Sequence, residues 1–349
     1  MNILIFKHGL LGDVIVAIPA IHLLRRQYPD AHLILFLEKL PNDAHLISKD
    51  LLLETGIVDE VAEFTTSTVF DLFRLARNVR RLGKQALFAL NLERFGWSRK
   101  REVFFSLMGI HKVFGPSCLT RVSLGASDNI AHQLYGIAFL SCFEMVNAIN
   151  TETIYYPKLT VGSAINTFLK WSSINSVVAQ FSGIALLGIW SNMDSKRWPV
   201  DRFVEVANYL TETLNLLPVC IGGGHEEEVR AAKYITENSH ALSVVGQMSI
   251  CESYEFFKRA KLYIGNDTGA MHLAALAGLP CVSIFSAREA ADLWHPIGSD
   301  LHQVLKTSPP CSGCQLRVCK IPLDRCVDQI TVENVTSAVD RVLSASRGQ

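Results

Sequence analysis

The sequence predicts an α/β protein built from two doubly wound, parallel-sheet domains. Short apolar runs alternate with helical patterns along most of the chain, and this alternation is typical of parallel sheets covered by helices. The chain has 349 residues, which suits two domains at about 150 residues each. A stretch of weak periodicity with several Ser and Thr, residues 150–176, separates the two runs of alternation. We therefore expect an N-terminal domain at residues 1–160 and a C-terminal domain at residues 161–349.

The composition excludes two classes of protein. Hydrophobic residues make up 49% and charged residues 19% of the chain, and no apolar run approaches the roughly 18 residues of a membrane span. The formal net charge is zero, whereas a nucleic-acid-binding protein is expected to carry a strongly basic face. The first strand begins almost directly after Met1, without the features of a secretory signal, so we expect a cytoplasmic protein with no nucleic-acid partner.

The first strand, residues 2–6, is followed by a glycine-flanked loop and a helical pattern over residues 14–24. The loop contains Gly9, Gly12 and Asp13, but it lacks the endings of a P-loop and of a dinucleotide-binding loop. Asp13 stands where a helix N-cap is expected, and a plain cap is one interpretation. The other is a ligand contact, because open α/β sheets bind ligands at the carboxyl ends of their strands.

The rest of the N-terminal half continues the alternation. Strands are predicted at residues 32–37, 58–64 and 86–92, and helices at residues 46–53, 70–82 and 128–147. The helix at residues 70–82 has apolar and arginine-bearing faces, and its arginines are usually interpreted as a solvated face; they are Arg74, Arg77, Arg80 and Arg81.

A segment rich in aromatic and basic residues, residues 93–101, follows the strand at residues 86–92. It contains Arg94, Arg99 and Arg101. Its place at the carboxyl end of a strand favours contact with an acceptor substrate, and a plain surface loop is the alternative.

The C-terminal half repeats the alternation, with strands at residues 184–189, 217–221, 242–245 and 281–285 and helices at residues 201–214, 225–238 and 250–259. Between the last helix and the last strand lies a strand–turn–helix unit, with a strand at residues 262–264, a turn at Gly265 and Asn266, and an Ala-rich helix capped by Asp267 and Thr268.

The start of this Ala-rich helix is a candidate phosphate site. The first turn of a helix has unpaired N–H groups and the positive end of the helix dipole, which suit a phosphate. Gly269 permits close approach, and His272 lies about one turn along the helix. In the alternative interpretation, Asp267 and Thr268 only cap the helix of a Rossmann-like unit.

Four cysteines near the C-terminus form a cluster with gaps of two, four and six residues: Cys311, Cys314, Cys319 and Cys326. Four thiols at such spacings are able to hold zinc or iron, but the gaps are not those of a regular pair of CxxC knuckles. In a cytoplasmic chain, reduced structural thiols are the alternative.

Five motifs in order resemble glycosyltransferase family nine, whose best-known members are the ADP-heptose:lipopolysaccharide heptosyltransferases. They are Gly9-Leu10-Leu11-Gly12-Asp13, Ser195-Lys196-Arg197-Trp198-Pro199, Gly222-Gly223-Gly224-His225-Glu226, Asp267-Thr268-Gly269 with His272, and the cysteine cluster. The resemblance covers nearly the whole chain. It implies a GT-B architecture with a cleft between the domains, and inverting transfer without a metal. It also implies no cofactor and a sugar nucleotide held by the C-terminal domain.

The resemblance also implies roles for individual residues. Asp13 would be the base that deprotonates the acceptor hydroxyl, and Lys196 would contact the donor phosphates. The expected donor-binding residues are Asp267, Thr268, Gly269, His272, Gly222, Gly223, Gly224 and Glu226. The expected acceptor-binding residues are Gly12, Arg94, Arg99 and Arg101. Similar cysteines occur in the family without a metal being required for transfer, so no metal ligand is expected, with the cluster from Cys311 to Cys326 as the alternative.

The chain departs from the family pattern at two places. Gly224 stands where heptosyltransferases of the first type have a glutamate that contacts the ribose, and Phe285-Ser286-Ala287-Arg288 replaces a Phe-Gly-Pro-Thr-like segment. The identity of the nucleotide and of the sugar therefore stays open, with ADP-heptose and a lipopolysaccharide core or another cell-surface glycan as the expected pair. Peripheral contact with the inner face of the membrane is left open too.

Two other functions fit the same motifs. One is a non-catalytic, nucleotide- or glycan-binding relative of the transferases, and the other is a sugar-nucleotide epimerase of GT-B fold. The joint presence of Asp13, Lys196, Asp267 and His272 argues against a degenerate binding protein.

Overall fold

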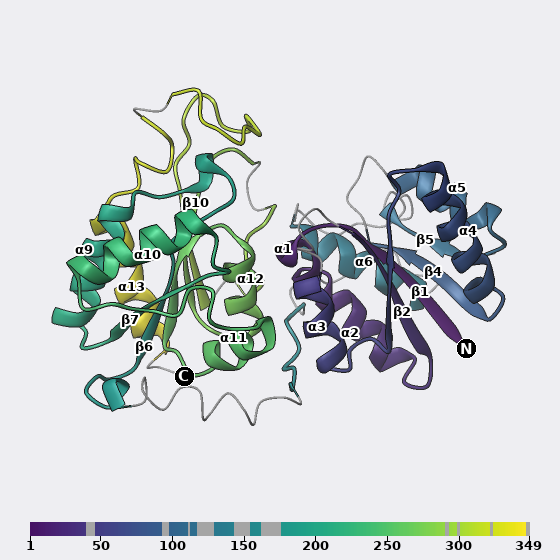
Figure 1. The fold of residues 1–349 in the computed structure, drawn as a ribbon, viewed down its shortest axis with the longest axis horizontal. Helices are drawn as coiled ribbons and strands as arrows, with labels where there is room; N and C mark the ends of the chain where they lie inside the picture. The colour runs from purple at the N-terminus through teal and green to yellow at the C-terminus, as the bar shows by residue number, and fades with distance from the viewer. Residues whose placement is uncertain are drawn as a thin grey trace. The chain divides into compact units, whose positions relative to one another are not determined.

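The structure is a computed structural model that describes residues 1–39, 46–92, 98–110, 112–116, 129–142, 154–161, 176–289, 293–298, 301–321 and 324–346. The chain divides into two compact units, Met1–Val161 and Gly162–Gln349 (Figure 1). Each unit is a parallel sheet with helices on both faces, as the alternation of strands and helices predicted.

The N-terminal sheet has five parallel strands in the order β3-β2-β1-β4-β5. Their bounds are β1 Asn2–Lys7, β2 His32–Glu38, β3 Glu60–Phe64, β4 Ala86–Asn91 and β5 Val113–Phe114. The two central strands, β1 and β2, are nearly continuous apolar runs because both faces of a parallel sheet are covered.

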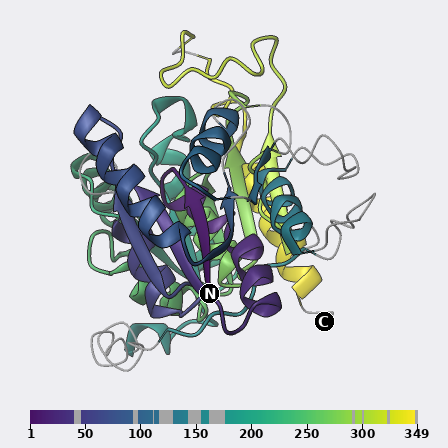
Figure 2. The same cartoon turned by 90° about the vertical axis from the view of Figure 1, so that its right-hand side faces the viewer.

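Helices cover both faces of this sheet. They are α1 Leu11–Ile15, α2 Ile18–Gln27, α3 Leu46–Glu54, α4 Val69–Gly83, α5 Ser98–Leu107 and α6 Ile130–Cys142. Figure 2 shows α4 on one side of the sheet, and α2 with its contacting partner α6 on the other. On the α4 side, Phe6 stacks on Phe36 with ring centroids 4.4 Å apart and packs against Phe105 at 3.9 Å. These rings belong to the core cluster that also takes Leu75 and Val79 from α4.

The C-terminal sheet has six parallel strands in the order β11-β10-β9-β6-β7-β8. Their bounds are β6 Ile184–Gly188, β7 Leu217–Ile221, β8 Leu242–Ser243, β9 Leu262–Asn266, β10 Cys281–Phe285 and β11 His302–Lys306. The chain first runs outward from β6 through β7 to β8, and it then returns to β9 on the other side of β6. The strand order therefore reverses between β6 and β9.

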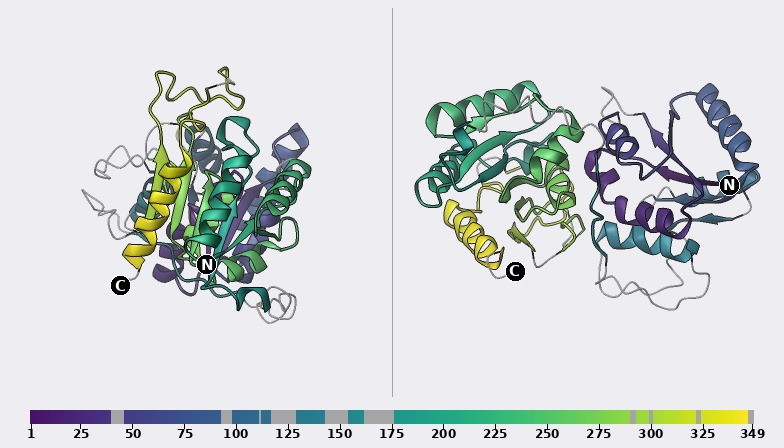
Figure 3. Two further views of the ribbon diagram at one scale, coloured as in Figure 1. Left: turned by 90° about the vertical axis from the view of Figure 1, so that its left-hand side faces the viewer. Right: turned by 90° about the horizontal axis from the view of Figure 1, so that it is seen from below.

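The helices of this unit are α9 Val200–Glu212, α10 Glu226–Asn238, α11 Ile250–Phe257, α12 Gly269–Leu276 and α13 Val332–Ser346, with a 3₁₀ helix at Asp194–Lys196. The C-terminal helix α13 packs beside α9 (Figure 3). Buried Trp198 joins these parts, since its indole N–H donates to the carbonyl of Ile330 at 2.8 Å and its ring meets Phe203 edge-on.

Several predicted boundaries were wrong. The helical pattern at residues 14–24 is two helices, because α1 ends at Ile15 and α2 begins at Ile18, with Pro19 in its first turn, where the fixed φ of proline suits a helix start. In the segment at residues 93–101, for which a surface loop was the alternative interpretation, helix α5 begins at Ser98. Gly265 and Asn266 belong to strand β9 instead of forming a turn. The elements β5, β11 and α13 were not predicted.

Candidate functional site

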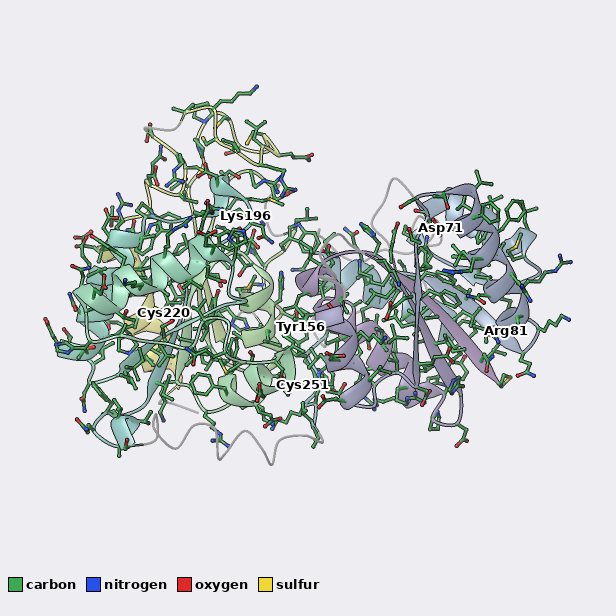
Figure 4. All side chains as sticks on the ribbon, in the orientation of Figure 1. Asp71, Arg81, Tyr156, Lys196, Cys220 and Cys251 are labelled. Atoms are coloured by element: carbon green, nitrogen blue, oxygen red, sulfur yellow. The ribbon has the colours of Figure 1, made fainter. Side chains whose placement is uncertain are left out.

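The loops that follow β6 and β9 lie at the point where the strand order of the C-terminal sheet reverses. Doubly wound sheets bind ligands at the carboxyl ends of their strands at such a point. The loop after β6 contains Lys196, and the loop after β9 contains Asp267. Two residues predicted from separate motifs are therefore brought to the same edge of one sheet, where Figure 4 labels Lys196.

Lys196 and Asp267 form an ion pair. The Lys196 ammonium lies 2.5 Å from Asp267 Oδ2 and also donates to the Asp267 carbonyl at 3.4 Å. The side chains are 12% and 5% exposed, respectively. This pairing fixes a normally flexible lysine in one position. Asp267 was predicted to bind the donor, but its carboxylate contacts Lys196.

The N-terminus of helix α12 lies directly beside this pair. Thr268 is the N-cap residue, as predicted, but its side chain makes no capping hydrogen bond; it shares one with the buried Tyr263 hydroxyl. Among the described residues, the backbone N–H groups of Gly269 and Ala270 donate no hydrogen bond. These N–H groups and the positive end of the helix dipole favour the binding of an anion at this terminus.

His272 is buried in the same helix, with its ring edge-on to Trp294 at a centroid distance of 6.2 Å. The sequence placed it near the ligand from its spacing along the helix. The structure puts it at the fourth residue of α12, in contact with Trp294 from the segment after β10.

The glycine loop after β7 is held by a buried carboxylate. Glu228 accepts a hydrogen bond from Gly224 N–H at 2.9 Å, and its carboxylate also accepts from the N–H groups of Gly223 and His225. Burial raises the pKa of Glu228, whereas these hydrogen bonds lower it. Because these donors are already used, the loop differs from a phosphate-binding loop whose N–H groups face a ligand. Glu226, also predicted to bind the donor, is exposed and pairs with Arg230.

Gly224 has a physical reason to be glycine. Its φ is +92°, and a Cβ at this position would lie 2.8 Å from the Cα of Gly246. A glutamate at this position would be strained and would collide with the neighbouring backbone. The departure from the family pattern at Gly224 therefore follows from how the loops after β7 and β8 pack.

Trp190 was not singled out from the sequence. It follows β6, its ring stacks on His225 at a centroid distance of 4.4 Å, and the guanidinium of Arg197 lies 4.6 Å from its centroid. Its indole Nε1 is buried and finds no acceptor among the described residues. A buried donor of this kind is satisfied by ordered water or by a polar ligand. An aromatic residue directly after a strand at the reversal point was the signal available in the sequence.

The segment with the cysteine cluster supports the turn that carries Lys196. Ser195 donates through its hydroxyl to the carbonyl of Leu316 at 2.7 Å, and through its N–H to the carbonyl of Arg317. Arg325 contacts Asp194 and is held by Asp328 at 2.8 Å. The 3₁₀ helix that ends at Lys196 is therefore held by residues more than 100 positions later in the chain.

The cysteines themselves are spread along this segment. Cys311 and Cys314 are exposed, Cys326 Sγ accepts from Ala287 N–H at 3.2 Å, and Cys319 Sγ accepts from Ile321 N–H at 3.4 Å. Burial raises the pKa of Cys326. Within the described ranges, no three His, Cys, Asp or Glu side chains form a group that could hold a metal ion.

In the N-terminal unit the strand order reverses between β1 and β4. Asp13 follows β1, and its Oδ2 accepts the N–H of Leu10 at 2.9 Å. Gly9 has φ +128°, and a Cβ there would lie 2.3 Å from Asp13 Cβ, so glycine is required for this loop. Asp13 was predicted as the N-cap, but the helix begins at Leu11, and Asp13 lies inside its first turn with Gly12 just before it.

The other predicted acceptor residues are Arg94, Arg99 and Arg101. Arg94 lies outside the described residues. Arg99 and Arg101 are in helix α5, and their side chains also lie outside the described part.

The profile of glycosyltransferase family 9 (heptosyltransferase) matches residues 171–323. The predicted resemblance to glycosyltransferase family 9 is confirmed. The matched residues include Lys196, the glycine loop, and the stretch from Asp267 to His272, whereas Asp13 lies outside them. The lipopolysaccharide heptosyltransferase 1 of Campylobacter coli is 26% identical over 106 residues, and this alignment spans 29% of the chain and 31% of that relative.

Two solved structures align over nearly the whole chain. The glycosyl transferase of family 9 from Veillonella parvula has a TM-score of 0.73 at 16% identity, covering 98% of this chain and 97% of that one. The ADP-heptose lipopolysaccharide heptosyltransferase II of E. coli has a TM-score of 0.70 at 16% identity, covering 99% and 100%. At these identities the likeness shows the fold, so the prediction of two parallel-sheet domains of the GT-B class is confirmed.

Proposed function

We infer that this protein is an inverting glycosyltransferase, which transfers a heptose or a related sugar from a nucleoside diphosphate sugar to a lipopolysaccharide core or another cell-surface glycan. The observation that carries the proposal is the ion pair between Lys196 and Asp267, beside the unpaired N–H groups of helix α12. This arrangement supports the proposal, because a fixed cation and a helix N-terminus suit a phosphate and doubly wound sheets bind ligands at this edge.

The C-terminal unit is the donor-binding domain in this proposal. The Lys196 ammonium and the N–H groups of Gly269 and Ala270 contact the diphosphate, and they stabilise the charge that grows on it as it leaves. Asp267 acts by holding Lys196 in place. The expected nucleotide is ADP, because the structural relative from E. coli is an ADP-heptose enzyme. The Trp190 N–H supplies a polar contact near the nucleoside.

The N-terminal unit contributes the base. The acceptor hydroxyl attacks the anomeric carbon, its proton passes to the Asp13 carboxylate, and the bond to the nucleoside diphosphate breaks with inversion at carbon. Lys196 and the helix terminus supply the positive charge at the departing diphosphate, so the proposed transfer requires no metal ion.

Product analysis tests the reaction class. The protein is incubated with ADP-heptose and a lipopolysaccharide core acceptor lacking heptose, with and without EDTA. We expect inverted glycoside and stoichiometric ADP in both samples. A free epimerised sugar nucleotide would support the epimerase, and tight ADP binding without any product would support the non-catalytic alternative. Activity that EDTA removes and Mg²⁺ restores would contradict the metal-independent mechanism.

Lys196→Ala is the negative control, and Lys233→Ala is the matched surface control. Lys233 is an exposed lysine on α10 that pairs only with Glu237 in the described part of the chain. Other nucleoside diphosphate sugars are then screened by calorimetry if ADP-heptose gives no binding.

A further inference from the structure

Helix α4 has one face in the core and one face in solvent. The Thr68 side chain caps its start through a capping box with Asp71. Leu75 and Val79 point inward and are buried in the core cluster of the N-terminal unit. Since side chains repeat every 3.6 residues, this fixes which residues of α4 point outward.

The first turn of the outward face is apolar. Phe70 is 87% exposed and Phe73 is 70% exposed, and the two are neighbours on the helix surface because they are three residues apart. Val69 is 67% exposed beside them. Single exposed apolar side chains are normal, but a cluster of this kind marks an interaction surface.

Arginines continue the same face toward the end of the helix. The four arginines of α4 are exposed, and within the described ranges none of them forms an ion pair. They are Arg74, Arg77, Arg80 and Arg81. The single acidic residue of the helix, Asp71, is already bound to Thr68. Phe70, Phe73, Arg74 and Arg77 line a shallow hollow together with Asp71. Figure 4 labels Asp71 and Arg81 at the two ends of α4.

We propose that the outward face of α4 binds the surface of an anionic lipid bilayer. Exposed phenylalanines enter the boundary between headgroups and acyl chains, and arginines bind lipid phosphates, which is the pattern of helices that lie in a membrane interface. Charge complementarity selects this occupant, because four guanidiniums that pair with no described carboxylate lie beside an apolar cluster and fit a surface that is both anionic and apolar.

The position of α4 connects this surface to the acceptor side. Strand β3 ends at Phe64 and α4 starts at Val69, so the phenylalanines lie at the carboxyl edge of the N-terminal sheet. Asp13 follows β1 at that same edge, since all five strands are parallel. A glycolipid held in the bilayer is therefore presented to the edge that carries Asp13. This last step rests on the proposed function, whereas the binding of lipid does not.

Vesicle co-sedimentation tests the binding. The full-length protein is mixed with vesicles of equal parts phosphatidylglycerol and phosphatidylcholine, and with vesicles of phosphatidylcholine alone. We expect binding to the anionic vesicles and little to the neutral ones. Arg77→Gln with Arg81→Gln should weaken binding about 25-fold, at about fivefold for each arginine near the surface. Phe70→Ser with Phe73→Ser should weaken it at least about tenfold, even at low salt.

Matched variants elsewhere serve as controls. Arg230→Gln with Lys233→Gln removes two exposed charges from α10, and Val318→Ser with Ile321→Ser removes two exposed apolar side chains. These should bind vesicles as the unchanged protein does. The proposal would be overturned if the control variants lost as much binding as the α4 variants. It would also be overturned if the protein bound neutral vesicles as well as anionic ones, or if the α4 variants bound as the unchanged protein does. Lipid-free dimers that Phe70→Ser with Phe73→Ser dissociates would overturn it too, because the face would then join two copies.

A transfer assay separates this proposal from the proposed function. The α4 variants should transfer sugar to a soluble, delipidated acceptor at the unchanged rate and lose at least about tenfold activity on the same acceptor embedded in anionic vesicles. Equal activity of these variants on the embedded acceptor would overturn the link to the acceptor. If the protein transfers sugar to neither acceptor, the proposed function fails, and co-sedimentation still decides whether α4 binds lipid.

Discussion

Asp13 is the residue on which the proposed chemistry depends. The Asp13→Asn variant keeps the shape of the side chain but cannot take a proton from the acceptor. We expect kcat to fall by about 10²- to 10⁴-fold, the usual contribution of a general base. The affinity for ADP, measured by calorimetry, should stay within about twofold, because the base acts on the acceptor. If the variant retains more than about a tenth of the activity, Asp13 serves only the first turn of α1.

Lys196 is the corresponding residue of the donor side. Lys196→Gln should weaken ADP binding by about 10- to 100-fold, which corresponds to the loss of one charge-assisted hydrogen bond to phosphate. Asp267→Asn should also weaken it, since the lysine is then no longer held in place. A double-mutant cycle measured by calorimetry should show that the two losses are not additive. Fully additive losses would mean that Asp267 contacts the nucleotide independently of Lys196.

At the scale of elements, the loop between β7 and α10 offers a matched pair of substitutions. Gly224→Ala places a methyl group 2.8 Å from the Cα of Gly246 at a φ of +92°, whereas a Cβ on Gly223 would meet no atom within 4 Å. We expect Gly224→Ala to lower the free energy of unfolding by about 1–3 kcal/mol. Gly223→Ala should change it by less than about 0.5 kcal/mol. Urea unfolding measures both, and equal effects would contradict the close packing of the two glycines.

Stability against acid is a property of the whole molecule in which one buried histidine takes part. Burial lowers the pKa of His302 from 6.5 to about 4, while its Nε2 lies 2.9 Å from the carbonyl of Ile297. The folded state therefore binds fewer protons than the unfolded state between these values. The contribution of neutral His302 to the free energy of unfolding is therefore fully present above pH 6.5, and it is lost as the pH falls toward 4. The loss attributable to this residue is roughly 3 kcal/mol.

The His302→Gln variant removes this titration. Its unfolding free energy, measured by urea titration from pH 7 to pH 4, should fall less steeply than that of the unchanged protein. His240, which is on the loop before β8 and is exposed, provides the control variant His240→Gln. An identical pH profile for His302→Gln and the unchanged protein would show that this histidine is not buried in its neutral form.

No helix in the part of the chain that the structure describes is long and apolar enough to cross a bilayer. The exposed phenylalanines and arginines of α4 lie on the face of that helix opposite the buried Leu75 and Val79.

The sequence by itself determined the fold class and the candidate motifs. Apolar strands and amphipathic helices have characteristic periodicities over a few residues. The alternation of β1, β2, β6 and β9 with helices could therefore be predicted from the sequence. Thr268 was placed at the start of α12 because capping depends on neighbours in the chain. Strand β5 was missed because two residues give little local signal, whereas five-residue β11 and 15-residue α13 were missed despite their length.

Tertiary structure alone decided which residues meet. Lys196 and Asp267 are 71 positions apart, and their pairing follows from the order of β6 and β9 in the sheet, which no local pattern encodes. The capture of the glycine-loop N–H groups by Glu228, and the exclusion of a side chain at Gly224 by Gly246, likewise depend on how separate loops pack. A sequence pattern records the preferences of a residue and its near neighbours, whereas contacts between distant segments appear only once the sheet has brought their ends together.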